Sequence, residues 1–204
     1  MNQTPELQRA ALRLRLREQR RQLGPRQRML AAQGLRQTLA ALPALARADR
    51  VAGYWACQGE IPLNLVLADI EARKQSYWLP RLAPGRKLQF ARWRGGDTVV
   101  ANRYGIPEPA ASAPTIDVLK LDIVLLPLVA FDACGNRLGS GGGYYDRTLA
   151  ACKLLPQADR PLLVGVAHHF QQLGRLDAQP WDVPLDFVAT ERQLIDCTTQ
   201  RSAK

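Results

Sequence analysis

The chain has 204 residues, of which 47% are hydrophobic and 23% charged, a composition typical of a globular protein and not of a disordered one. A chain of this length can bury roughly 70% of its unfolded surface, so we expect residues 1–204 to form a single domain. The longest apolar run, residues 123–131, is far shorter than the roughly 20 residues of a membrane-spanning helix, so we expect no contact with a membrane. The net charge is +10, and residues 1–36 carry +7 of it.

Two helices are expected at the N-terminus, over residues 8–23 and 25–42, because leucines recur at helical spacing and Gly24-Pro25 separates the two patterns. Together they would form an arginine-rich helical hairpin over residues 8–42. A solvated helix face explains most of the arginines, and nucleic-acid phosphates or an anionic small substrate are the two sharper alternatives. Outside residues 1–36 the net charge is only +3, which argues against nucleic acid as a partner.

Strand and helix patterns alternate between residues 50 and 195, the expected α/β core. Helices are expected over residues 63–74 and 144–153, and strands over residues 51–56, 75–80, 88–93, 122–129, 161–167 and 186–190. The strand over 122–129 is apolar on both faces, which is typical of a central parallel strand, whereas 88–93 alternates like an antiparallel one. Residues 104–114 contain three prolines and are expected to form an irregular loop. This order of elements predicts a three-layer α/β sandwich with a mostly parallel sheet.

The four cysteines form no C-x-x-C pair, and no histidine cluster has zinc spacing. Arginines interrupt every apolar stretch near the N-terminus, so no secretion signal is expected there. We therefore expect reduced thiols in a cytoplasmic protein. His168 and His169 follow a strand, where adjacent side chains point to opposite faces, so structural histidines are expected rather than a shared site.

The segment with the most chemical information is FDACGNRLGSGGGYYDR, residues 131–147, between the most apolar strand and a helix. Four of the five residues from 139 to 143 are glycines, and glycine lets backbone N–H groups approach an anion closely. The helix that follows adds further unpaired N–H groups, so a phosphate is the expected ligand, and Arg137 could bind it with two hydrogen bonds. The segment matches neither the Walker A pattern nor G-x-G-x-x-G.

This segment, R-L-G-x-G-x-G-Y-Y-D from Arg137 to Asp146, resembles the signature of the 5-formyltetrahydrofolate cyclo-ligase family. Four more blocks resemble that family in the same order. They are Arg9-x-x-Leu12-Arg13, Gln58-Gly59-Glu60-Ile61, Tyr104-Gly105-Ile106-Pro107-Glu108-Pro109 and Trp181-Asp182-Val183-Pro184-Leu185-Asp186. The resemblance therefore covers nearly the whole chain.

The resemblance implies a fold related to ribose-phosphate isomerases and CoA transferases. It also implies an ATP- and Mg²⁺-dependent enzyme that closes 5-formyltetrahydrofolate to 5,10-methenyltetrahydrofolate and releases ADP and phosphate. The formyl oxygen would attack the γ-phosphate of ATP before N10 adds. Reduced folate and ATP would be the partners of a monomeric protein. A sugar-phosphate isomerase or a CoA transferase on the same fold is the alternative, because fold alone does not decide function.

Site residues can be carried over from the family by position. The ATP-binding positions correspond to Arg9, Ala10, Ala11, Leu12, Arg13, Arg137, Leu138, Gly139, Ser140, Gly141, Gly142, Gly143, Tyr144 and Tyr145. Arg9 stands where the family usually has lysine. Some members carry a basic residue at the positions of Ser140 and Gly142; if that residue serves the γ-phosphate there, another cation must do so here.

The metal positions of the family correspond to Asp146 and Asp182, and the folate contacts to Trp55, Glu60 and Tyr104. Arg137, Tyr144 and Glu60 are the expected catalytic residues. Glu60 could accept hydrogen bonds from the pterin or take the N10 proton, and the sequence leaves both roles open. Viewed singly, Asp146 could be a helix N-terminal charge, Asp182 a turn cap and Trp55 a core residue of its strand.

Overall fold

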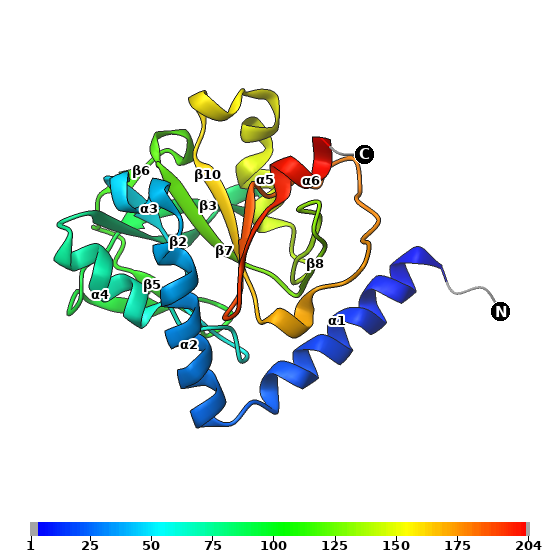
Figure 1. Ribbon diagram of the computed structural model, residues 1–204. Helices are drawn as coiled ribbons and strands as arrows, with labels where there is room; N and C mark the ends of the chain where they lie inside the picture. The colour runs from blue at the N-terminus through cyan, green and yellow to red at the C-terminus, as the bar shows by residue number, and fades with distance from the viewer. Residues whose placement is uncertain (1–3, 203–204) are drawn as a thin grey trace.

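The computed structural model describes residues 4–202, and its centre is an eight-stranded sheet (Figure 1). The strands of this sheet are β1 (Arg50–Ala52), β2 (Ser76–Ala83), β3 (Lys87–Arg92), β6 (Thr115–Ile116), β7 (Ile123–Pro127), β10 (Leu162–Val166), β11 (Phe187–Ala189) and β12 (Leu194–Asp196). Their order is β12-β11-β10-β7-β1-β2-β3-β6. The five strands from β11 to β2 are parallel, β12 and β3 pair antiparallel to the two ends of this block, and β6 pairs antiparallel to β3. The predicted mostly parallel sheet is confirmed.

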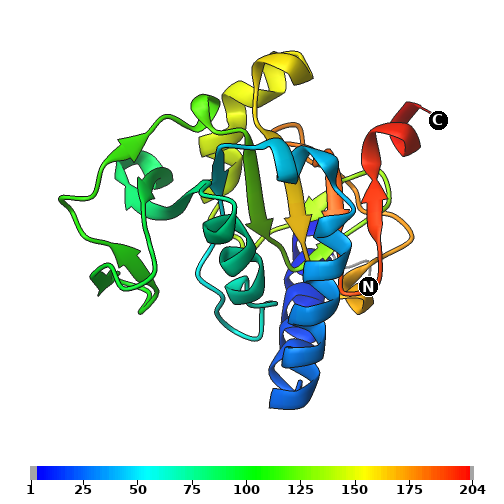
Figure 2. The ribbon, with the colours of Figure 1, turned by 60° about the vertical axis from the view of Figure 1, so that its left-hand side comes forward.

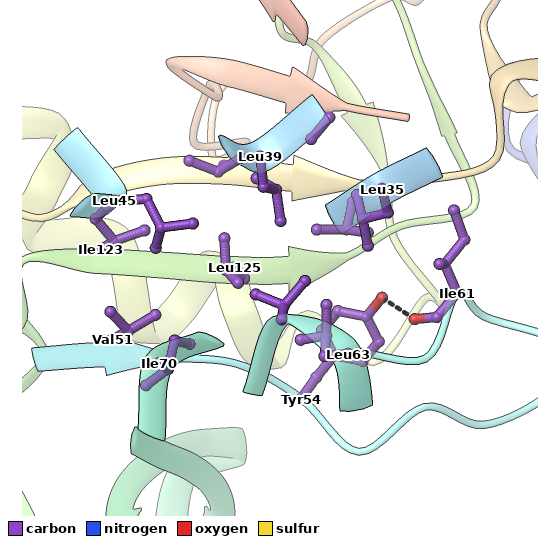
Figure 3. Close-up of a cluster of buried hydrophobic side chains, with 14 of the residues drawn as sticks. Leu35, Leu39, Leu45, Val51, Tyr54, Ile61, Leu63, Ile70, Ile123 and Leu125 are labelled. Carbon is purple, nitrogen blue, oxygen red and sulfur yellow. Dashed lines mark hydrogen bonds between the residues drawn. The ribbon is translucent and has the colours of Figure 1, made fainter. Parts of the chain in front are cut away.

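Helices cover both faces of the sheet, which gives the predicted three layers. One face carries α2 (Pro25–Ala40), α3 (Pro43–Arg47) and α4 (Asn64–Ala72), and the other carries α5 (Tyr144–Leu149) and α6 (Cys197–Ser202). The central strand β7 serves both layers because its side chains alternate. Ile123 and Leu125 pack toward α2–α4 (Figure 3), whereas Val124 and Leu126 pack on the opposite side. The apolar run seen in the sequence is therefore a strand buried on both faces.

Two short hairpins flank the sheet. Strands β4 (Val99–Ala101) and β5 (Pro107–Pro109) pair antiparallel and project from the body at the left of Figure 2. Strands β8 (Ala130–Phe131) and β9 (Arg137–Leu138) pair antiparallel just after β7. The expectation of an irregular loop over 104–114 is thus wrong for β5, whose prolines fit a two-stranded edge that needs few backbone donors.

Helix α1 (Pro5–Arg21) diverges from α2, so the two form a V in Figure 1. Leu16 of α1 packs on Val129, Ala130 and Leu138 around the β8–β9 hairpin. Helix α2 instead contributes Leu35 and other residues to the main core. The predicted helical pair is present, and α1 lies beside the carboxyl end of β7, where ligands bind in parallel sheets.

Other boundaries differ from the predictions. The strand expected over 51–56 ends at Ala52, and Gly53 is packed so closely that a Cβ would lie 1.9 Å from the Tyr77 hydroxyl. Trp55 is therefore outside any strand. The helix expected over 144–153 is α-helical only to Leu149, and residues 150–154 continue as a 3₁₀ helix. Further 3₁₀ turns cover Pro84–Arg86, Val118–Lys120, Gln157–Asp159 and His169–Gln171. No helix among residues 4–202 is long and apolar enough to cross a bilayer.

Candidate active site

A cavity of about 570 Å³ lies at the carboxyl end of the parallel strands. Its walls come from α1, from residues 54–60 after β1, from the β4–β5 hairpin, from residues 137–146 and from residues 181–182. Segments far apart in the sequence therefore meet at one place. Each of the five blocks that resemble the cyclo-ligase family contributes residues to the lining of this cavity.

The glycine-rich bend, residues 139–143, forms one wall of the cavity. Gly141 and Gly143 have φ angles of 99° and 67°, a left-handed conformation that residues with a Cβ rarely adopt. Among the described residues, no backbone N–H of the bend donates a hydrogen bond, and the first bond of α5 runs from Arg147 N to the Gly143 carbonyl at 3.2 Å. The bend therefore offers unpaired donors beside a cavity, as an anion-binding backbone does.

Three arginines of α1 approach this bend. Arg9, Arg13 and Arg17 are four residues apart and so lie on one face of the helix. They donate hydrogen bonds to the carbonyl oxygens of Asp177 (2.8 Å), Gly139 (2.9 Å) and Ser140 (2.8 Å). Burial lowers the pKa of Arg13, and the charges of Arg9 and Arg17 add to that effect. A solvated helix face is therefore the wrong explanation for these three side chains.

The two aspartates expected to hold magnesium line this same cavity. Asp146 accepts a hydrogen bond from Arg137 at 2.6 Å, and Asp182 lies 3.5 Å from Arg9. Within residues 4–202 no group of three or more His, Cys, Asp or Glu could hold a metal ion. Mg²⁺ commonly takes only one or two carboxylates, with waters and substrate phosphates as its other ligands. Two carboxylates beside an anion-binding bend fit that donor set.

Arg137 lies at the back of the cavity. Its side chain is only 4% exposed and donates to the Val183 carbonyl as well as to Asp146. The predicted two-fold contact with a phosphate is thus not the arrangement in this structure, where both donors bind protein. Arg137 instead holds Asp146 in place.

Glu60 lines the same cavity from the segment that follows β1. Its Oε2 accepts from the backbone N–H of Cys57 at 3.0 Å and from the Cys57 thiol at 3.6 Å. Burial raises the pKa of Glu60, and the Cys57 N–H and then the charge of Arg20 oppose that effect. Trp55, 37% exposed, lines the same side and meets Trp93 edge to face at 5.8 Å.

Three tyrosines of the hairpin and of α5 also line the cavity. The hydroxyl groups of Tyr104, on the β4–β5 hairpin, and Tyr144, at the start of α5, are 2.9 Å apart. Arg103 also donates to the Tyr144 hydroxyl. The hydroxyl of Tyr145, deeper in the cavity wall, is buried and has no hydrogen-bond partner in the described structure.

Some expected ATP-binding residues do not reach the cavity. Ala10 and Ala11 are exposed on another face of α1, and Leu12 and Leu138 pack in the cluster around the β8–β9 hairpin. The sequence interpretation also missed lining residues. These include Arg17, Cys57, Glu108 and Trp181. The spacing of four from Arg13 could have identified Arg17.

Comparison with known proteins identifies relatives of this chain. A 5-formyltetrahydrofolate cyclo-ligase of Haemophilus influenzae is 36% identical over 180 residues, covering 87% of this chain and 94% of that one. The enzyme of the same name from Escherichia coli K12 is 33% identical over 178 residues, covering 86% and 96%.

Solved structures are similar too. The 5,10-methenyltetrahydrofolate synthetase of Aquifex aeolicus matches with a TM-score of 0.78 and 28% identity, covering 93% of this chain and 92% of that one. A Mycoplasma pneumoniae protein of that name matches with a TM-score of 0.71 and 24% identity, covering 90% and 98%. The sequence pattern of the 5-formyltetrahydrofolate cyclo-ligase family matches residues 5–191. The chain therefore belongs to the 5-formyltetrahydrofolate cyclo-ligase family.

Proposed function

We propose that this protein uses ATP and Mg²⁺ to convert 5-formyltetrahydrofolate into 5,10-methenyltetrahydrofolate, with release of ADP and phosphate. The observation that supports this most is one cavity with two unlike halves. One half has unbonded N–H groups of residues 139–143, arginines and two aspartates. The other has the buried carboxylate of Glu60 and the exposed indole of Trp55. A triphosphate fits the first half and a flat, hydrogen-bonding pterin the second.

The reaction needs both halves to be close. The formyl oxygen attacks the γ-phosphorus, the bond from that phosphorus to the β,γ-bridging oxygen breaks, and ADP leaves. N10 then adds to the activated formyl carbon and loses its proton, and the C–O bond breaks to release phosphate. Phosphoryl transfer of this kind depends on positioning and charge stabilisation. In this chain Arg9, Arg13 and Arg17 would supply positive charge around the phosphates.

Asp146 and Asp182 would hold Mg²⁺, which when bound neutralises charge on the phosphate oxygens. Arg137 would keep Asp146 oriented, because one hydrogen bond anchors the guanidinium on the Val183 carbonyl and the other holds the carboxylate. Glu60 would accept hydrogen bonds from the guanidine-like edge of the pterin, and Trp55 would contact its ring. Tyr104 and Tyr144 would cover the mouth and exclude water.

An assay with purified protein, Mg-ATP and 5-formyltetrahydrofolate tests this function. We expect a new near-ultraviolet absorbance from the methenyl product, which the substrate lacks, and one ADP per product. Folded protein that forms no product would refute the proposal. Omitting ATP or chelating Mg²⁺ should each abolish the signal, and a signal that persists without them would refute the corresponding part.

A further inference from the structure

Arg20 is a buried arginine that does not line the cavity. Its residue exposure is 1%, although arginine usually keeps its charge in water. From the last turns of α1, its Nη1 donates to the Leu128 carbonyl at 3.1 Å and lies 3.7 Å from Oε1 of Glu60. Buried charges in proteins are normally paired, and Glu60 is the carboxylate within reach. A residue outside the cavity thus contacts a side chain that lines it.

The backbone of α1 also holds the turn that carries Glu60. Gln58 and Gly59 have φ angles of 49° and 79°, a conformation disfavoured for glutamine. Gly59 sits against α1 so closely that a Cβ would lie 2.5 Å from the Arg20 carbonyl oxygen. On the other side, Nε2 of His168 lies 3.0 Å from the Gly59 carbonyl oxygen. The turn is therefore held between α1 and His168, which lies two residues after β10.

The surroundings of Glu60 make Arg20 its nearest cation. The ionisable groups that face Glu60 are Arg17 and Arg20 from α1, Tyr54 and Cys57 from its own loop and Tyr145 from α5. The two tyrosines and the thiol are neutral at physiological pH, because burial raises the pKa of each. Besides the hydrogen bonds from Cys57, the charges of Arg20 and then Arg17 favour the charged carboxylate, and Arg17 also donates to the Ser140 carbonyl.

We propose that Arg20 is a positioning residue for the folate half of the site: it holds the Glu60 carboxylate charged and aimed into the cavity. This inference rests on the proposed function, in which Glu60 receives the donors of the pterin edge. A charged acceptor binds such donors more strongly than a protonated one. One helix would then serve both substrates, with Arg9, Arg13 and Arg17 at the nucleotide and Arg20 behind the pterin.

The test compares wild type with Arg20→Gln, Arg20→Lys and Arg21→Gln. Arg21 is the matched control, because it is the next residue and its side chain is 58% exposed. The titration of Glu60 is followed by ¹³C NMR of the carboxyl group, assigned with Glu60→Gln. Arg20→Gln should raise the pKa of Glu60 and weaken 5-formyltetrahydrofolate binding about tenfold, as loss of one charge-assisted hydrogen-bonding site does. Nucleotide affinity should not change.

Arg20→Lys should restore most of the wild-type titration, and Arg21→Gln should leave titration and affinity unchanged. The proposal is overturned if folded Arg20→Gln titrates and binds folate like wild type. It is also overturned if Arg20→Lys shifts as far as Arg20→Gln, or if Arg21→Gln has the same effect. Wild type that forms no methenyl product would refute the proposed function instead, because the Glu60 titration needs no folate.

If Arg20→Gln does not fold, the double variant Arg20→Gln/Glu60→Gln tests whether Glu60 is the partner of Arg20. Breaking a buried pair leaves an uncompensated charge, and removing both charges relieves it. We expect the double variant to fold and to melt above Arg20→Gln. A double variant that is as unstable as the single one would show that Glu60 is not the partner of Arg20.

Discussion

Arg17 of α1 donates from Nη2 to the carbonyl oxygen of Ser140 at 2.8 Å, which brings a helix from the start of the chain onto the glycine-rich bend. Its Nε is buried without a hydrogen-bond partner in the described structure. A donor in that state beside a cavity is ready for an anion. Arg17 therefore places a cation at this bend.

We therefore expect Arg17→Gln to raise the KM for ATP about tenfold, the effect of losing one charged hydrogen-bonding group. The KM for 5-formyltetrahydrofolate should stay the same. Arg15→Gln is the control, because Arg15 is exposed on another face of α1. Initial rates of methenyl formation measure both constants. Equal ATP constants in the two variants would remove Arg17 from the nucleotide site.

The bend itself can be tested with two glycines that both tolerate a Cβ. An added Cβ at Gly139 or Gly174 meets no atom within 4 Å, and neither has a positive φ. Only Gly139 lines the cavity. Gly139→Ala should raise the KM for ATP about tenfold because the methyl group would occupy phosphate space. Gly174→Ala should leave it unchanged, and both should keep wild-type stability or gain up to about 1 kcal/mol.

Two outcomes of the comparison between Gly139→Ala and Gly174→Ala would contradict this prediction. If Gly139→Ala binds ATP like wild type while urea unfolding shows a normal fold, the triphosphate does not lie against the bend at Gly139. A loss of stability in Gly139→Ala alone would instead show that the space beside it is needed by the protein.

Asp146→Asn should lower turnover by about a hundredfold or more, because it removes a charged oxygen proposed to hold Mg²⁺. Half-activation should also require more Mg²⁺. The free energy of unfolding should fall by no more than about 3 kcal/mol, because Asp146 is partly exposed and Val183 still accepts from Arg137. Asp159→Asn, at an exposed site outside the cavity, is the control.

Wild-type turnover in Asp146→Asn would exclude this aspartate from the reaction. Reduced turnover with an unchanged Mg²⁺ requirement would assign it to orienting Arg137 instead.

His168 gives the stability of the fold a pH dependence. Burial lowers the pKa of His168 below its usual value of 6.5. As the pH falls, this histidine is therefore protonated at a higher pH in the unfolded chain than in the folded one. Stability should therefore fall as the pH drops below 6.5 toward the lowered folded-state pKa, by up to about 1.4 kcal/mol per pH unit. Urea unfolding at about pH 7.5 and about pH 5.5 measures this.

The chain has only two histidines, so the matched pair is His168→Gln and His169→Gln. The first should flatten the pH dependence between those two values, and the second should retain the wild-type slope. An equal slope in wild type and His168→Gln would mean that another group causes the loss.

The sequence could predict what depends on local patterns. The run from Ile123 to Pro127 predicted a central strand because it is apolar on both faces. The four glycines among residues 139–143 predicted the bend. The termination of β1 at Ala52 depends on packing between Gly53 and Tyr77, which no local pattern records. The sequence therefore placed Trp55 in a strand, whereas the fold leaves it partly exposed at the cavity.

Contacts between residues far apart in the sequence could not be predicted from local patterns either. Arg20 and Glu60 are 40 positions apart in the sequence. Arg137 of β9 contacts Val183 only because the fold brings two distant segments together at the carboxyl end of the sheet. Short hairpins such as β8–β9 have two residues in each strand, which is too few to show the alternation of apolar and polar residues that identifies a strand. Helical spacing could have grouped Arg17 with Arg9 and Arg13, but not shown which face turns inward.

The length of α1 has a consequence for how the chain can vary. At 1.5 Å per residue, Arg9 and Arg20 are about 16 Å apart along the helix axis. The helix therefore fixes the distance between the nucleotide-side arginines and the arginine behind Glu60. One inserted residue between them would rotate everything before it by about 100° and carry those guanidinium groups away from the bend. Substitutions on the outer face are tolerable, whereas the length of this segment is not free to change.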